Sequence, residues 1–161
     1  MGPIKNGDSH MKAYVLLFGA IVTVMCAQSR PTFSSEPPSG PLQSLSEARI
    51  FALGAVGFAG KAPQELLLFR AIMALNPDEA KEGLEKLYSS SNPQAMSYAL
   101  VGMRKIDRRR YEELLASARA SDVTVRTMWG CEILDEKFRD VAEQLDSGKY
   151  DPLLLHYKPV P

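Results

Sequence analysis

The chain of 161 residues, 45% hydrophobic and 24% charged, has the composition and length of a single folded domain. This composition excludes wholesale disorder, which needs low hydrophobicity together with high net charge. The formal net charge of zero also gives no global bias toward nucleic acid or acidic lipid.

The first 27 residues predict export. Lys12 precedes an uncharged run at residues 13–27, and the run ends on the small side chain of Ala27. A basic start, an apolar stretch of about 7–15 residues and a small residue at its end are typical of a secretory signal. The run of 15 residues is shorter than the roughly 20 that a spanning helix needs. We therefore interpret residues 1–27 as a leader and expect a periplasmic or secreted protein.

Two alternatives keep the chain at a membrane. Residues 13–27 could be retained as an N-terminal anchor, or Cys26 could carry a lipid as in bacterial lipoproteins. The lipidation alternative fits less well because Met25 stands where a lipoprotein signal has glycine or alanine.

A Pro/Ser-rich linker is predicted at residues 28–45. Four prolines interrupt this stretch, namely Pro31, Pro37, Pro38 and Pro41. Proline removes backbone donors and favours an extended chain, so we expect a tether without packed elements. The folded domain is then predicted at residues 46–161.

The domain is predicted to be mainly helical. Apolar side chains recur at helical spacing, and the Asn-Pro pairs at Asn76 and Asn92 and the aspartate Asp107 supply start signals. The predicted helices are residues 63–75, 77–89, 93–106, 108–120 and 135–145. The first of them is almost entirely apolar, which predicts a helix that is buried all round. Leu68, Phe69, Leu100 and Met103 are expected to be mostly buried.

Two stretches depart from the helical pattern. Residues 123–133 alternate β-branched or apolar side chains with polar ones at period two, which predicts a short strand. Gly54, Gly57 and Gly60 mark residues 50–60 either as a helix with close neighbours or as a strand with bends. If residues 50–56 form a strand, the two segments would pair into a small β ribbon.

The rhythm of the helices resembles a known repeat architecture. The Asn-Pro starts at Asn76 and Asn92 lie 16 residues apart, and a further helix follows them. This helix-pair pattern at residues 63–120 is similar to HEAT and armadillo repeats, which run about 40 residues each. The resemblance implies helix hairpins, and a plain antiparallel helical bundle explains the same pattern.

A basic run is the sharpest charge feature of the predicted domain. It comprises Arg104, Lys105, Arg108, Arg109 and Arg110, and three of these arginines open a helix. Positive charge at a helix N-terminus opposes the helix dipole, so either local ion pairs or an acidic ligand should offset it. Local ion pairs are the favoured interpretation, and anion or nucleic-acid binding is the alternative.

Cys131 is the one cysteine that remains if the leader is removed after Ala27. A buried, inert side chain beside Trp129 and Ile133 is the favoured interpretation, and a reactive thiol is the alternative. His156 is the one histidine outside the leader, and no spacing brings it to Cys131. No catalytic, metal or cofactor motif is recognisable, so we predict no catalytic, metal-binding or cofactor-binding residues.

These patterns predict an exported helical module that binds a protein partner or serves a structural role. The C-terminal residues 150–157 are apolar and are expected to pack back onto the domain, and a docking segment for a partner is the alternative. An alternative is a small extracytoplasmic enzyme that uses Cys131 or a carboxylate pair such as Glu112 and Glu113. A second alternative is an anion or nucleic-acid binder that uses the basic run at residues 104–110.

Overall fold

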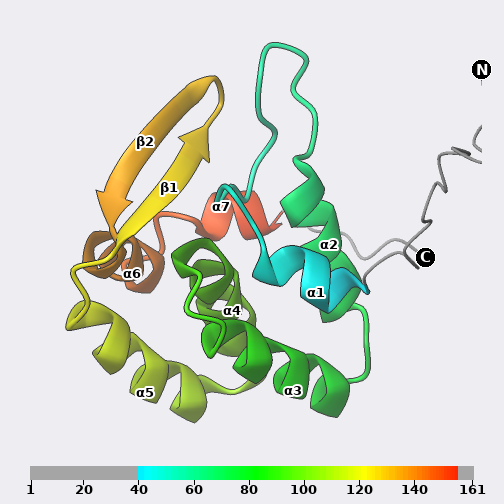
Figure 1. Cartoon of the computed structure of the whole chain (residues 1–161), viewed down its shortest axis with the longest axis vertical. Helices are drawn as coiled ribbons and strands as arrows, with labels where there is room; N and C mark the ends of the chain where they lie inside the picture. The colour runs from blue at the N-terminus through cyan, green and yellow to red at the C-terminus, as the bar shows by residue number, and fades with distance from the viewer. Residues whose placement is uncertain (1–39, 156–161) are drawn as a thin grey trace, which may run out of the picture. The chain divides into compact units, whose positions relative to one another are not determined.

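The computed structural model describes residues 40–155, and this part of the chain is mainly helical with one two-stranded antiparallel sheet (Figure 1). The predicted fold class, mainly α with a short β ribbon, is confirmed. The leader, Cys26, residues 28–39 of the linker and His156 lie outside the described residues. Among the residues described, no helix is long and apolar enough to span a membrane.

The elements follow one another along the chain with short connections. The helices are α1 (Pro41–Ser46), α2 (Gln64–Met73), α3 (Pro77–Tyr88), α4 (Pro93–Ile106), α5 (Arg108–Arg119), α6 (Phe138–Asp146) and α7 (Asp151–Leu155). Strands β1 (Thr124–Trp129) and β2 (Glu132–Lys137) form a hairpin between α5 and α6.

The predicted start signals cap three helices. The Asn76 side chain accepts a hydrogen bond from the Glu79 N–H at 2.9 Å, and the Asp107 side chain accepts one from the Arg110 N–H at 3.0 Å. Asn92 caps α4 and also donates from Nδ2 to two backbone carbonyls before α2, at 2.9 Å each. Asn92 therefore ties the start of α4 to the segment that follows α1.

The linker prediction was wrong at its C-terminal end. Helix α1 begins at Pro41, within the stretch expected to be extended, and Leu45 is completely buried. Proline is tolerated in the first turn of a helix, where its missing N–H would have no partner. Burial of Leu45 against the domain stabilises this short helix, so the packed part of the chain starts before residue 46.

Helix α4 lies at the centre of the core. Its buried residues lie on all sides, and it contacts α3, α5, α6 and β1. Gly102 lets α3 approach closely, because a Cβ at this position would lie 2.6 Å from Leu84 Cδ1. Leu100 and Met103 are fully buried, as predicted.

Helix α2 is buried on one face only, so the prediction of a helix buried all round was wrong. Leu66, Phe69 and Ile72 are buried, whereas Leu67 is 45% exposed. Leu68 is partly buried and packs against the core. The buried residues have the spacing of a helix that lies on the surface of a domain. Apolar side chains also occur on the exposed face of this helix.

The ribbon forms, but between different segments from those predicted. Strand β1 pairs with β2, which overlaps the start of the helix predicted at residues 135–145. Residues 50–56 form no strand and contribute isolated bridges, Phe51 to Thr127 and Val56 to Gly130, both parallel to β1. Gly57 and Gly60 have positive φ angles of 70° and 57°, so the glycine-rich stretch turns as a loop.

The C-terminal segment packs back onto the domain as far as it is described. Tyr150 is 2% exposed, and Leu153 packs against the core. Arg104 of α4 holds Asp151 of α7 at 2.5 Å. The prediction for residues 150–157 is thus confirmed at Tyr150 and Leu153.

Candidate functional site

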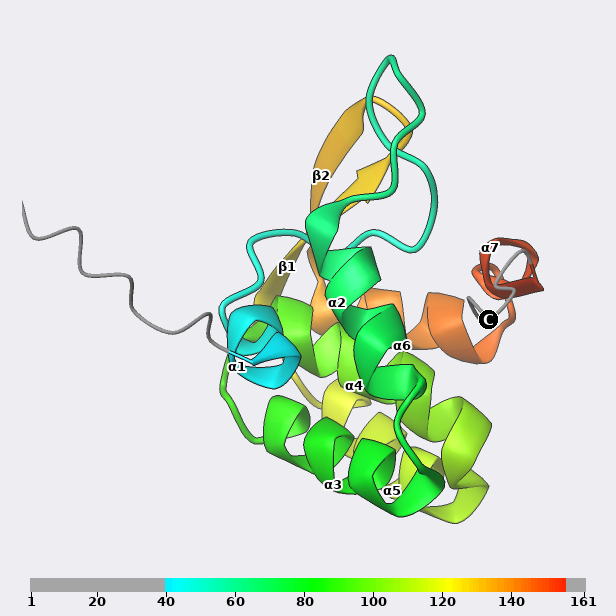
Figure 2. The same ribbon diagram turned by 90° about the vertical axis from the view of Figure 1, so that its right-hand side faces the viewer.

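Two loops project together from one end of the helical layer (Figure 1, Figure 2). They are the loop at residues 54–61, between α1 and α2, and the turn of the β1–β2 hairpin. The Gly57 N–H donates to the Gly130 carbonyl at 2.7 Å, so the two loops are joined by their backbones. We call residues 54–61 and 128–134 the projecting tip.

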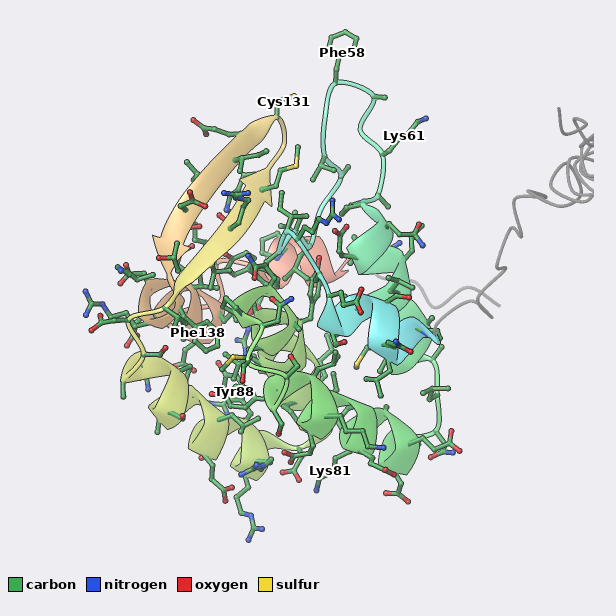
Figure 3. The ribbon with its side chains drawn as sticks, viewed as in Figure 1. Phe58, Lys61, Lys81, Tyr88, Cys131 and Phe138 are labelled. Atoms are coloured by element: carbon green, nitrogen blue, oxygen red, sulfur yellow. The ribbon has the colours of Figure 1, made fainter. Side chains whose placement is uncertain are left out.

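The projecting tip exposes apolar side chains. Phe58 is fully exposed at 104% of its reference area, and Ile133 and Leu134 are 56% and 39% exposed. Figure 3 shows Phe58 and Cys131 at the ends of the two loops, both directed away from the helices. Burial of a phenylalanine side chain is favourable by about 1.5–3 kcal/mol, and the exposed Phe58 does not gain this free energy.

The base of the tip is held by a buried tyrosine. The Tyr98 hydroxyl accepts a hydrogen bond from the Ala52 N–H at 3.1 Å and donates one to the Ala52 carbonyl at 3.0 Å. Tyr98 and Ala52 are both buried, and desolvation raises the pKa of Tyr98 above its ordinary value. The hydroxyl is therefore neutral and serves both backbone groups of Ala52.

A row of aromatic rings links the hairpin to the helices. Neighbouring rings have centroid distances of 4.8 Å (Trp129 and Tyr150), 5.5 Å (Tyr150 and Phe51), 5.0 Å (Phe51 and Tyr98) and 5.5 Å (Tyr98 and Phe69). Lys149 lies over the Trp129 ring at 5.1 Å. Such contacts add to the free energy gained by burial, so the hairpin has a firm attachment below its turn.

A polar cluster fixes the inner side of β2. The Thr127 hydroxyl donates to Glu136 at 2.5 Å, and the Gln144 side-chain amide donates to the other Glu136 oxygen at 2.8 Å. Gln144 in turn accepts from Lys149 at 2.8 Å. Because these groups bond one another, the cluster anchors the ribbon to α6.

The basic run is engaged in ion pairs with the domain's own acids. Arg110 donates to both oxygens of Glu85, at 2.7 and 2.9 Å, and Arg108 donates to Glu112 at 2.9 Å. Arg109 is 91% exposed and lies 4.0 Å from Glu113. The favoured prediction of a helix junction with local ion pairs is thus confirmed for these arginines.

The pKa shifts in this region follow from the same pairs. The hydrogen bond from Arg110 lowers the pKa of Glu85, and hydrogen bonds to Glu85 and Glu113 raise the pKa of Arg110. Asp107 has a lowered pKa because the Lys81 ammonium hydrogen-bonds to it. The positive charges at the start of α5 are therefore balanced within the domain, with little left to attract an anion.

Members of the basic run bond acids on different helices. Arg104 reaches α7 through Asp151, whereas Arg108 and Arg110 bond acids on α5 and α3. Lys105 is exposed at the end of α4 and borders a small apolar pocket. A nucleic-acid interface needs basic side chains gathered on one face, and here Arg104, Arg108 and Arg110 pair with acids of the domain itself.

Cys131 occupies the turn of the hairpin and is exposed, so the prediction of a buried side chain was wrong. The period-two alternation placed Cys131 inside a strand, but the chain reverses direction at Gly130 and Cys131. Among residues 40–155, no histidine lies near the thiol. Within the same range, no three metal-ligating side chains lie close enough to hold an ion.

Glu112 and Glu113 also form ion pairs within the domain. Glu112 accepts from Arg108 at 2.9 Å, and Glu113 accepts from Arg110 at 2.8 Å. Both carboxylates lie exposed on α5. General acid–base catalysis needs a carboxyl group that faces a substrate in a sheltered site, which this helix face does not provide.

Sequence reasoning missed the projecting tip as a site. The apolar Phe58 between Gly57 and Gly60 was a usable signal, since an aromatic residue in a glycine-rich turn has no helix or strand face to bury it. The exposure of Ile133 and Leu134 had no such signal, because the alternation in residues 123–133 indicated a half-buried strand.

No protein-family model matches the chain. No curated protein and no solved structure matches it either.

Proposed function

We propose that the chain is an exported protein-binding module whose contact surface is the projecting tip. The full exposure of Phe58 carries this proposal. Aromatic side chains are enriched among the few residues that dominate the binding energy of protein interfaces. Ile133 and Leu134 extend the apolar contact from the hairpin side.

The attachment of the tip supports a binding role. The 2.7 Å backbone bond between Gly57 and Gly130 joins the two loops, and the two bonds of Tyr98 to Ala52 hold their base. A surface that is already ordered loses less conformational entropy on binding. The tip can therefore present Phe58 to a partner without a large ordering cost.

Export rests on the leader. The basic start at Lys12 and the apolar run at residues 13–27 favour translocation, and a partner would then be met outside the cytoplasm. Mass spectrometry of the mature protein from its native source tests this part. We expect residues 11–27 to be absent or membrane-held, and an intact N-terminus on soluble cytosolic protein would contradict export.

Site-specific photo-crosslinking tests the binding function. A benzoyl-phenylalanine replaces Phe58 in the full chain, and a matched variant carries it at Leu75, which is 48% exposed after the C-terminal end of α2. Both variants are expressed in the native host and irradiated. We expect a defined protein adduct from position 58 that position 75 does not give. The same adducts from both positions, or none from position 58, would refute the proposal.

A further inference from the structure

Strand β2 forms an open edge of the sheet. In the part of the chain that the structure describes, the sheet has two strands, and β1 lies between β2 and Phe51. β2 is thus the outer strand, as Figure 1 shows. An exposed strand edge presents unpaired N–H and C=O groups to which another extended chain can bond.

The ladder determines which residues of β2 face the open edge. The Phe51 N–H donates to the Arg126 carbonyl at 2.8 Å, and the Met128 N–H donates to the Phe51 carbonyl at 3.0 Å. Arg126 and Met128 therefore turn their backbone groups away from β2. Asp135 and Ile133 are their partners across the ladder, so they turn theirs away from β1, toward the open edge.

The side chains along this edge have a definite order. Glu132 and Asp135 are exposed acids, and Ile133 and Leu134 between them are exposed apolar residues. Arg126 bonds Asp135 at 3.2 Å, but this carboxylate stays 58% exposed. A strand added beside β2 would meet an acid, two apolar side chains and a second acid in consecutive positions.

We propose that β2 binds an extended segment of the partner protein by strand addition, and that this segment carries a basic, two apolar and a basic residue in succession. The proposal rests on the binding function assigned to the projecting tip. Opposite charges across neighbouring strands stabilise the pair, and so do apolar side chains that face one another. Backbone hydrogen bonds supply affinity, and the alternate side chains supply selectivity, as in other strand-addition complexes.

The acids also disfavour pairing between two copies of this chain. In the two antiparallel registers that pair most of β2, Glu132 would face Glu136 of the other copy, or Asp135 would face its own equivalent. Like charges opposite each other destabilise a strand pair. The edge is therefore protected against its own copies while it stays open to a basic segment.

The variant Ile133→Pro distinguishes strand addition from simple apolar contact. The Ile133 N–H faces the open edge, so Ile133→Pro removes an edge donor without removing a bond between β1 and β2, and proline is tolerated on edge strands. Ile133→Thr is the matched control, because it removes the apolar side chain and keeps the donor. The midpoints of urea unfolding show whether both variants keep the parent's fold.

The test uses a phage-displayed library of random peptides about ten residues long, selected on the full chain. We expect the selected peptides to share the basic–apolar–apolar–basic order. Their affinity should fall about tenfold or more in Ile133→Pro relative to Ile133→Thr, the loss expected for an unmade backbone hydrogen bond. In the unsubstituted chain, the bound peptide should slow hydrogen exchange at the Ile133 and Asp135 amides.

Several results would overturn strand addition. The first is a set of selected peptides that share no residue order, and the second is equal peptide affinity of Ile133→Pro and Ile133→Thr. The third is unchanged hydrogen exchange at the Ile133 and Asp135 amides when the peptide binds. The fourth is a dimer of this chain that Ile133→Pro abolishes. If such a result comes with a specific adduct at Phe58, the binding function of the tip stands and strand addition alone fails. If Phe58 gives no specific adduct either, both proposals fail.

Discussion

Replacement of Tyr98 by phenylalanine should loosen the base of the projecting tip. The hydroxyl bonds both the N–H and the carbonyl of Ala52, at 3.1 and 3.0 Å, and both residues are buried. Tyr98→Phe leaves these two backbone groups without their partner and away from water. A buried group without a partner costs about 1–3 kcal/mol, so the free energy of unfolding should fall by about 2–4 kcal/mol after the gain from removing the hydroxyl.

Tyr88→Phe is a matched control, since the Tyr88 hydroxyl donates to the Leu114 carbonyl at 2.9 Å in a half-buried position. It should cost about 0.5–1.5 kcal/mol. Urea unfolding followed by the fluorescence of Trp129, the one tryptophan of the chain, gives both values. If Tyr98→Phe costs no more than Tyr88→Phe, the tyrosine does not hold the base of the tip.

Other predictions concern the core, the caps and the thiol. Leu100→Ala should lower the free energy of unfolding by about 2–5 kcal/mol, because removal of the fully buried side chain leaves a cavity. The control Arg109→Lys, at an exposed position, should change it by less than about 0.5 kcal/mol. Equal urea midpoints of the two variants would show that α4 does not face the core. Asn92→Ala should cost about 2–4 kcal/mol, since it removes a helix cap and two further bonds, against about 1 kcal/mol for the simple cap in Asn76→Ala. Cys131 should react with a thiol reagent in the folded protein about as fast as in urea, and strong protection of the thiol would contradict its exposure on the hairpin turn.

The helical part of the fold was predictable because its signals are local. Asn76, Asn92 and Asp107 mark the starts of α3, α4 and α5 through hydrogen bonds to residues two or three positions ahead. Such bonds depend on the sequence alone, whatever the rest of the domain does. The same holds for the apolar spacing of α4, whose bounds match the prediction.

The burial of individual side chains depended on tertiary neighbours and was less predictable. Leu67 is as apolar as Leu66, but it lies on the side of α2 that no other described element covers. Leu45 is buried although prolines precede it, because the domain supplies the neighbours that its own stretch lacks. Neither outcome follows from the period of the apolar residues.

The site was missed because the alternation of apolar and polar residues continues through the hairpin turn in the sequence. In the ladder, however, Thr127 pairs with Leu134 and Met128 with Ile133, so the odd-numbered positions change faces between β1 and β2. The pattern therefore indicated one strand where there are two. The helix predicted at residues 135–145 also started too early, since residues 135–137 belong to β2 and α6 begins at Phe138.

The affinity of the captured partner for matched variants tests the binding role of the tip most directly. The purified adduct protein is titrated with the parent chain, with Phe58→Ser and with Leu75→Ser, which removes an apolar side chain of 48% exposure outside the tip. Loss of a buried phenylalanine should weaken binding about tenfold or more, whereas Leu75→Ser should stay within about twofold of the parent. Equal affinities of Phe58→Ser and the parent would contradict the assignment of the projecting tip as the binding surface.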